Sequence, residues 1–155
     1  MTSMSRHGWS RRAALQAAGA GVVAVALPAS GRASVQDADD LERKLIGAGT
    51  IIRSGKVQLI LKDVAESGAN EPIRVVVDSP MNAADYVKAI HVLAEGNPHP
   101  GVSSWFFGPR AGKAEIGFRM RLAKSQVVRA YAVMAYGSVW QARQEIKVTI
   151  GGCGG

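Results

Sequence analysis

Cysteine, histidine and aromatic residues are scarce in this chain of 155 residues, which has one Cys, three His and 6% Phe, Trp and Tyr. One cysteine cannot close a disulfide bond within the chain or build a cysteine-rich zinc site, so a disulfide scaffold is excluded. Disorder is also excluded, because 47% of the residues are hydrophobic and only 20% are charged. From these scarcities we predict that the chain binds no metal.

Acidic residues are absent from the first 33 positions, and this shortage accounts for much of the formal net charge of +7. That segment contains Arg6, Arg11, Arg12 and Arg32. Residues 34–155 contain fifteen Lys and Arg against twelve Asp and Glu, a mild surplus with no basic cluster in the sequence. The composition therefore predicts no binding to nucleic acid.

Residues 1–33 have the three-part layout of an export signal. A basic start is followed by an apolar stretch at 13–27 and then by Gly31 and Ala33, small residues that suit cleavage after Ala33. The apolar stretch has fifteen residues, mostly Ala, Gly and Val, and is too short and too weakly hydrophobic to stay in a bilayer. We therefore expect the signal to be cleaved, with no attachment to the membrane afterwards.

The basic start of this signal resembles the twin-arginine type. Arg11 and Arg12 are followed by Leu15, although Ala14 stands where this signal favours Phe. The alternative is the basic start of a general secretory signal. Both predict a periplasmic protein, and the twin-arginine route, which exports folded proteins, favours export together with a bound partner subunit.

Residues 34–150 predict one all-β domain with a short helix before the strands. Residues 37–46 form an amphipathic pattern, acidic at its start and basic at its end, which stops at Gly47. Segment 85–94 fits either a helix or a strand, and we favour a strand because its neighbours are strands. With it the chain has about seven strands, at 56–61, 73–77, 85–94, 103–107, 115–122, 127–135 and 139–150. This number and spacing predict an immunoglobulin-like antiparallel β-sandwich.

The chain ends in glycines that surround its single cysteine, in the order Gly151, Gly152, Cys153, Gly154 and Gly155. A lone cysteine is most often a small buried apolar residue, but glycine neighbours offer no apolar surface against which to pack. We therefore predict that residues 151–155 form a flexible swinging arm with an exposed thiol. Fully extended, this arm spans roughly 16 to 18 Å, enough to enter an active site below a partner's surface.

An exposed, unpaired thiol in an exported protein is open to oxidation and disulfide exchange, so we expect the protein to use it. An ordinary thiol is only partly ionised at neutral pH, and no residue near Cys153 in the sequence would ionise it further. Activation would then come from a partner enzyme. Cys153 is predicted to attach a substrate covalently, and no catalytic residue is predicted in this chain.

Several stretches of the chain are similar to one known family. They are Asp78-Ser79-Pro80-Met81, the segment 84–91 with 94–95 and 97–98, the loop 108–112 (GPRAG) and the terminal 151–155 (GGCGG). In combination they resemble the SoxY family, which supplies the sulfur-carrier subunit of the bacterial Sox thiosulfate-oxidation system. The resemblance covers nearly all of residues 34–155, and the twin-arginine leader agrees with it.

The resemblance implies a periplasmic, non-catalytic carrier that holds thiosulfate-derived sulfur on Cys153. It implies a heterodimer with a SoxZ-like subunit and transient visits to three Sox enzymes. The haem enzyme SoxAX would join thiosulfate to the cysteine oxidatively, SoxB would hydrolyse off sulfate, and a SoxCD-type dehydrogenase, where present, would oxidise the remaining sulfane sulfur. Haem, manganese and molybdenum belong to those partners, so the resemblance implies no cofactor in this chain.

Other functions fit parts of the sequence. An exported β-sandwich binding module would use the tail cysteine for a disulfide bond to another chain. A ubiquitin-like carrier would activate Gly155, but that chemistry needs ATP and a cytosolic enzyme, and the export leader argues against it. An enzyme acting alone would need a second cysteine or a histidine close to the tail in sequence, and the chain has neither.

Two features of the β domain have more than one interpretation. Neighbouring residues of a strand face opposite sides, so the aromatic run at 105–107 belongs either to the core alone or also to a surface for the SoxZ-like subunit. We interpret His91 as a partly buried structural histidine rather than as a ligand or a base.

Overall fold

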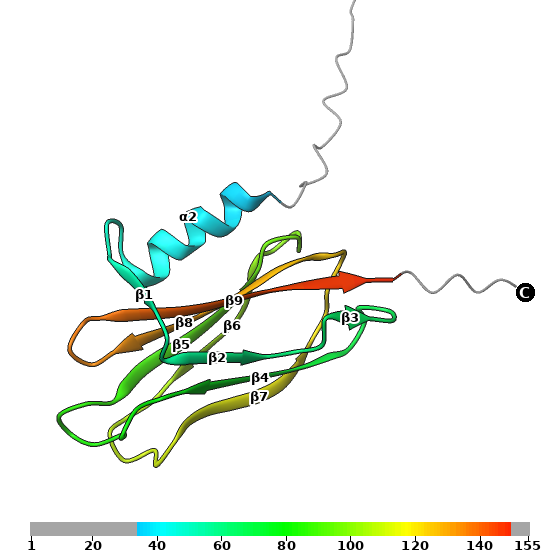
Figure 1. The fold of residues 1–155 in the computed structure, drawn as a ribbon. Coiled ribbons are helices and arrows are strands. Elements are labelled where there is room, and N and C mark those ends of the chain that lie inside the picture. The colour runs from blue at the N-terminus through cyan, green and yellow to red at the C-terminus, as the bar shows by residue number, and fades with distance from the viewer. Residues whose placement is uncertain (1–33, 150–155) are drawn as a thin grey trace, which may run out of the picture. The chain divides into compact units, whose positions relative to one another are not determined.

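A computed structural model describes residues 34–149, in which one helix precedes nine β-strands (Figure 1). The helix is α2 (Val35–Ile46). The strands are β1 (Ile52–Ser54), β2 (Val57–Ile60), β3 (Val64–Ala65), β4 (Glu71–Val77), β5 (Val87–Ala94), β6 (Gly101–Phe106), β7 (Ala114–Met120), β8 (Gln126–Met134) and β9 (Val139–Val148). The expectation of a mostly β protein with a short helix before its strands is confirmed.

Two sheets make up the domain. The larger sheet has the order β1-β9-β8-β5-β6, with β3 also paired to β9, and the smaller has the order β2-β4-β7. The long strands pair antiparallel, whereas β1 and β3 run parallel to β9. In Figure 1 the two sheets form the two layers of a β-sandwich, with α2 along the outer side of the larger one. The predicted immunoglobulin-like sandwich is thus confirmed.

Apolar side chains from facing sides of the two sheets form the core. In β4 they alternate with exposed residues, since Ile73, Val75 and Val77 are buried while Pro72 and Arg74 between them are exposed. The core also contains β-branched residues of β5 and β8, among them Ile90, Val92 and Val128. Burial of apolar surface stabilises a fold by about 25 cal/mol per Å², so the core between the two sheets is the main source of stability.

Strand β5 explains why segment 85–94 was ambiguous in the sequence. Ile90 and Val92 face the core between the sheets, while Leu93 is buried on the opposite face with Tyr131 and Val139 beneath α2. A strand that is covered on both faces loses the alternation of apolar and polar residues, so its pattern resembles a helix. Segment 85–94 is a strand, as its neighbours predicted.

Strands β1 and β3 were not predicted. They have three and two residues, and each exists because its backbone pairs with β9, Ile52 with Val139 and Val64 with Lys147. Segments this short have no periodicity of their own, so local patterns cannot reveal them. At these two places the chain lies parallel to β9, whereas the long strands pair antiparallel as predicted.

The helix starts two residues earlier than expected. Ser34 is its N-cap: its side chain accepts a hydrogen bond from the Asp37 backbone N–H at 3.2 Å, and the Asp37 side chain accepts from the Ser34 backbone N–H. This capping box satisfies N–H groups that the first turn leaves unpaired and so extends the helix to Val35. Its end agrees with the prediction, because the Gly47 N–H donates to the Arg43 carbonyl. Within residues 34–149, the helix α2 is not long and apolar enough to cross a bilayer.

Candidate functional site

The strand that leads to the C-terminal segment is held on both sides. On one side, β9 pairs with β3, and the Thr149 N–H continues the ladder by donating to the Ala65 carbonyl at 2.9 Å. On the other side, the Val148 N–H donates to Ser125 Oγ at 2.9 Å. The end of β9 is therefore anchored at one end of the two sheets, as Figure 1 shows.

Gly68 allows a neighbouring loop to pack against the end of β9. A Cβ at Gly68 would lie 2.5 Å from the Leu122 carbonyl oxygen and 3.0 Å from Val148 Cγ1, and the residue has a φ of +62°. Only glycine fits both the close approach and the left-handed backbone. The Leu122 N–H donates to the Gly68 carbonyl at 2.7 Å, which ties this loop to the end of β7.

The predicted attachment residue and its arm lie outside the described residues. These are Gly151, Gly152, Cys153, Gly154 and Gly155, and the same holds for Arg11 and Arg12 of the export signal. The last described residue is the hydrogen-bonded Thr149, which stands four residues before Cys153 in the sequence. Four residues span at most about 14 Å when extended, which is the upper bound on the distance between the backbones of Thr149 and Cys153.

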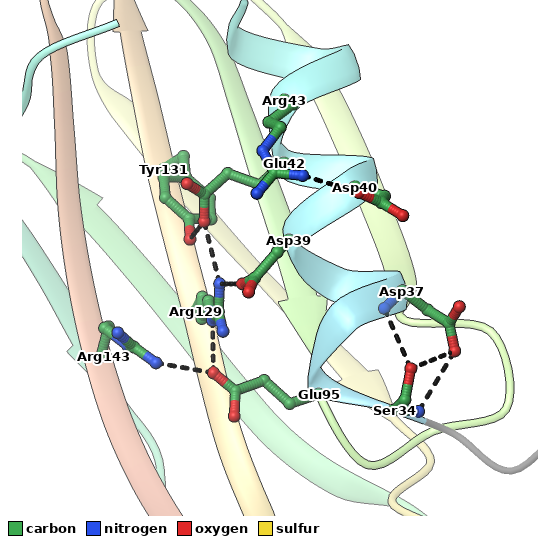
Figure 2. Close-up of polar contacts among 10 residues, drawn as sticks. All are labelled: Ser34, Asp37, Asp39, Asp40, Glu42, Arg43, Glu95, Arg129, Tyr131 and Arg143. Atoms are coloured by element: carbon green, nitrogen blue, oxygen red, sulfur yellow. Dashed lines mark hydrogen bonds and ion pairs between the residues drawn. The ribbon is translucent and has the colours of Figure 1, made fainter. Parts of the chain in front are cut away.

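The described residues also contain a buried ionic cluster, which the sequence patterns had not predicted (Figure 2). Arg129 on β8 has a side chain that is only 4% exposed, and its Nη1 lies 2.7 Å from Asp39 Oδ1 and 2.9 Å from Glu42 Oε2 of α2. Its Nε donates to Glu95 just after β5, which also accepts from Arg143 Nη2 at 2.7 Å. The cluster therefore links α2 to β8, to the end of β5 and to β9, all in the larger sheet.

The electrostatics of this cluster are those of a closed ion-pair network. Burial by itself would lower the pKa of Arg129, but hydrogen bonds to Asp39, Tyr131 and Glu95 outweigh it and raise that pKa. Burial raises the pKa of Tyr131, and the hydrogen bond that its hydroxyl donates to Glu42 raises it further. Each of the three carboxylates already forms an ion pair with Arg129, so the role of the cluster is to hold the helix against the sheet.

Two signals in the sequence could have revealed this cluster. Arg129 interrupts a long apolar strand at 127–135, where a charge has to be paired if it is buried. Asp39 and Glu42 are three residues apart, which places them on the same side of a helix. Neither signal identifies the partner, because the contacts span about ninety positions of sequence.

His91 is a structural residue, as interpreted from the sequence. It is 4% exposed, its Nδ1 lies 2.8 Å from Ser104 Oγ, and its ring packs edge-on against Phe106. Burial lowers its pKa from the ordinary 6.5, so the neutral ring is favoured. Within residues 34–149, no group of three or more His, Cys, Asp or Glu side chains is placed to hold a metal ion.

A known family matches the chain from the middle of α2 to the terminal cysteine. It is the family described as sulfur oxidation protein SoxY, and the match covers residues 42–153. The chain belongs to the SoxY family. The matched range covers more than half of the chain, includes the whole sandwich and ends at Cys153.

Solved structures agree with this assignment. The sulfur carrier protein SoxY from Chlorobium limicola f thiosulfatophilum has a TM-score of 0.63 and 29% sequence identity, covering 76% of this chain and 100% of that chain. A superoxide reductase (neelaredoxin) from Ignicoccus hospitalis has a TM-score of 0.55 and 25% identity, covering 61% and 80%. The superoxide reductase from Nanoarchaeum equitans, at 11% identity and a TM-score of 0.52, covers 62% and 100% and shares the fold alone. No curated protein matches the chain.

Membership of the SoxY family supports a sulfur-carrier role and implies partners in the sulfur-oxidation system. The SoxY carrier from Chlorobium has a higher identity to this chain than either superoxide reductase, and it is covered along its full length. The expectation, drawn from the sequence, that the chain is a SoxY protein is confirmed.

Proposed function

We propose that this protein carries sulfur intermediates of thiosulfate oxidation as covalent adducts on Cys153 and presents them to the enzymes of the Sox cycle. The observation that carries the proposal is the family match, which runs from the helix to Cys153 itself. The anchoring of Val148 and Thr149 supports it, because it fixes the point on the sandwich from which the chain continues to Cys153.

The first step of the proposed cycle is an oxidation. A disulfide bond forms between Cys153 Sγ and the sulfane sulfur of thiosulfate, the thiol proton passes to water, and two electrons pass to the haem of a SoxAX-type partner. The second step is a hydrolysis without electron transfer. Water attacks the sulfone sulfur in a SoxB-type enzyme, sulfate leaves, and a persulfide stays on Cys153.

In this proposal the chain is a carrier and its partners are the catalysts. A SoxCD-type enzyme, where the system has one, would oxidise the persulfide sulfur before a second hydrolysis frees the thiol. A SoxZ-like subunit would form the stable heterodimer. The ionic cluster around Arg129 and the buried His91 have structural roles, so the described residues contribute a scaffold to the cycle.

The proposal is tested by intact mass spectrometry of the processed protein from cells grown on thiosulfate, with and without reductant. We expect reducible increments of thiosulfonate and persulfide sulfur that map to Cys153 by peptide analysis. Unmodified thiol or a plain disulfide-linked dimer, in cells that are oxidising thiosulfate, would contradict the carrier and favour the covalent-linkage module.

We also propose that the protein works in the periplasm and arrives there by the twin-arginine route. Replacing both residues of the pair, Arg11→Lys with Arg12→Lys, should lower the periplasmic fraction about tenfold or more, because that transport system reads the arginine pair itself. Cell fractionation and immunoblotting measure the effect. Arg6→Lys, an equal change outside the pair, is the control, and undiminished export of the double variant would show the general secretory route instead.

A further inference from the structure

The last residues of β9 extend beyond the strand that runs beside them. Strand β9 pairs with β8 only as far as Ile146, which lies opposite Gln126, the first residue of β8. Beyond that pair, the Val148 N–H donates to the side-chain Oγ of Ser125 at 2.9 Å rather than to a strand backbone. On this side of β9, the position of Val148 therefore depends on the loop that contains Ser125.

Two side-chain amides hold this loop, which connects β7 to β8. Asn97 Oδ1 accepts a hydrogen bond from the Ala123 N–H at 3.0 Å, and Asn97 Nδ2 donates to the Arg121 carbonyl at 2.9 Å. Gln126 Nε2 donates to the Lys124 carbonyl and to Asn97 Oδ1, both at 3.0 Å. We call Asn97 and Gln126 the amide clamp, because together they bind three backbone positions of the loop.

The amide clamp is itself fixed to the larger sheet. Just before it in the chain, Glu95 accepts from Arg129 and Arg143 in the buried ionic cluster (Figure 2). The next residue, Gly96, donates its N–H to Gln126 Oε1 at 2.7 Å. A continuous series of ion pairs and hydrogen bonds therefore runs from the cluster that holds α2 to the loop beside β9.

Gly96 and Gln126 leave this loop little freedom to move. A Cβ at Gly96 would lie 2.9 Å from both Gln126 Cβ and Lys124 Cε, so the approach is possible only without a side chain at this position. Gln126 is 8% exposed, and its amide oxygen and nitrogen both have partners. A buried amide of this kind is costly to rearrange, because each broken hydrogen bond leaves an unsatisfied polar group.

The loop that the amide clamp holds contributes little to the core. Within residues 121–125, only Leu122 is buried and the other four residues are exposed. The amide clamp thus stabilises a surface loop whose Ser125 side chain binds the end of β9. That end leads to Thr149 and, four residues later in the sequence, to Cys153.

We propose that Asn97 and Gln126 are positioning residues for the delivery of Cys153. They hold the loop that binds Val148 and so fix the point from which the chain continues to the thiol. The inference rests on the proposed carrier function, in which partner enzymes receive the loaded cysteine. Each backbone residue that an enzyme has to order when it binds the carrier costs conformational entropy, and fixing Val148 and Thr149 beforehand removes these two residues from that cost.

Amide hydrogen exchange of the free, full processed chain, followed by NMR, tests whether the amide clamp holds β9. Asn97→Ala removes three hydrogen bonds around the loop, so the Val148 amide should exchange about tenfold faster than in wild type. Ser125→Ala removes the acceptor of that amide directly and should have the same effect. Ser125→Thr keeps a hydroxyl at this position and should exchange at the wild-type rate.

Asn82→Ala is the matched control. Asn82 Oδ1 also accepts from two backbone N–H groups, those of Ala84 and Asp85 at 2.9 Å, but in the loop that precedes β5 rather than in the one that follows it. This variant should leave exchange at Val148 unchanged. A general loss of stability would speed exchange at Val148 in both variants, whereas loss of the amide clamp speeds it in Asn97→Ala alone.

A kinetic test separates positioning from the reactivity of the thiol. Tetrathionate loads the carrier without an enzyme: the Cys153 thiol gives its proton to the buffer, the thiolate attacks a central sulfur of tetrathionate, thiosulfate leaves with the electron pair of the broken sulfur–sulfur bond, and a thiosulfonate stays on Cys153. Asn97→Ala should load within about twofold of the wild-type rate, because thiol exchange with a small molecule needs no positioning. For a SoxB-type enzyme acting on the loaded chain, Asn97→Ala should raise KM about fivefold and leave kcat within about twofold, since only the ordering of the bound chain changes.

Wild-type exchange at Val148 in Asn97→Ala, or an unchanged KM in that variant despite faster exchange, would overturn the proposal. So would an equal rise of KM in Asn82→Ala, which would reduce the amide clamp to a general contribution to stability. If the enzyme releases no sulfate from the loaded wild-type chain, the carrier function is contradicted instead, and exchange at Val148 still decides whether the amide clamp holds β9.

Discussion

Replacing Cys153 by serine should abolish sulfur loading while the fold is retained. The substitution removes the only sulfur nucleophile of the C-terminal segment, and serine cannot form the disulfide-type bond to the sulfane sulfur. The variant should show no thiosulfonate or persulfide increment by intact mass spectrometry. Reconstituted thiosulfate oxidation should fall to the background rate of the partner enzymes alone.

The structural consequences of Cys153→Ser should be minor, because residues 151–155 are mostly glycine and contribute no apolar core. We expect the melting temperature to change by less than about 1 °C. Deletion of Gly154 and Gly155 serves as the matched control, since it retains the thiol and should retain loading. A large loss of stability in Cys153→Ser, or loss of loading on deletion of the two glycines, would contradict a thiol carrier, the latter in favour of activation of the carboxyl terminus.

Replacing Arg129 by methionine should destabilise the domain strongly. Methionine keeps most of the volume but leaves Asp39 and Glu42 without their shared cation, and it leaves Glu95 paired with Arg143 alone. Removing one partner of a buried ion-pair network costs about 3–5 kcal/mol, and for a domain of this size the melting temperature should fall by about 10 °C or more. Thermal unfolding followed by circular dichroism measures the change.

Arg43→Ala is the control for Arg129→Met. Arg43 forms an ion pair with Asp40 on the same helix at 2.8 Å, but both side chains are about 60% exposed. An exposed pair is screened by solvent and contributes at most about 0.5 kcal/mol. If Arg129→Met unfolds at nearly the same temperature as Arg43→Ala, α2 is not held by this network and the apolar contacts of Leu41 and Leu45 suffice.

A comparison of strand β7 with the contacts of Arg129 shows which features sequence patterns can predict. The alternation of Ile116, Gly117, Phe118 and Arg119 predicted a strand, and β7 confirms it, because the period of a half-buried strand is local. The identity of the groups that satisfy Arg129 could not be predicted, because they come from a helix and a strand end far away in the sequence.

The sequence by itself determined the kinds of elements and the order of the long strands along the chain, and it alone carries the prediction of thiol chemistry at Cys153. These depend on periodicity over a few residues and on composition around Cys153, and neither needs a packed partner. Only the tertiary structure decided that β6 is an edge that leaves Trp105 and Phe106 exposed. It also decided that the end of β9 is anchored, with Thr149 hydrogen-bonded to Ala65 and Val148 to Ser125. Exposure at an edge and anchoring at an exit arise from strand pairing between distant segments, which no local pattern contains.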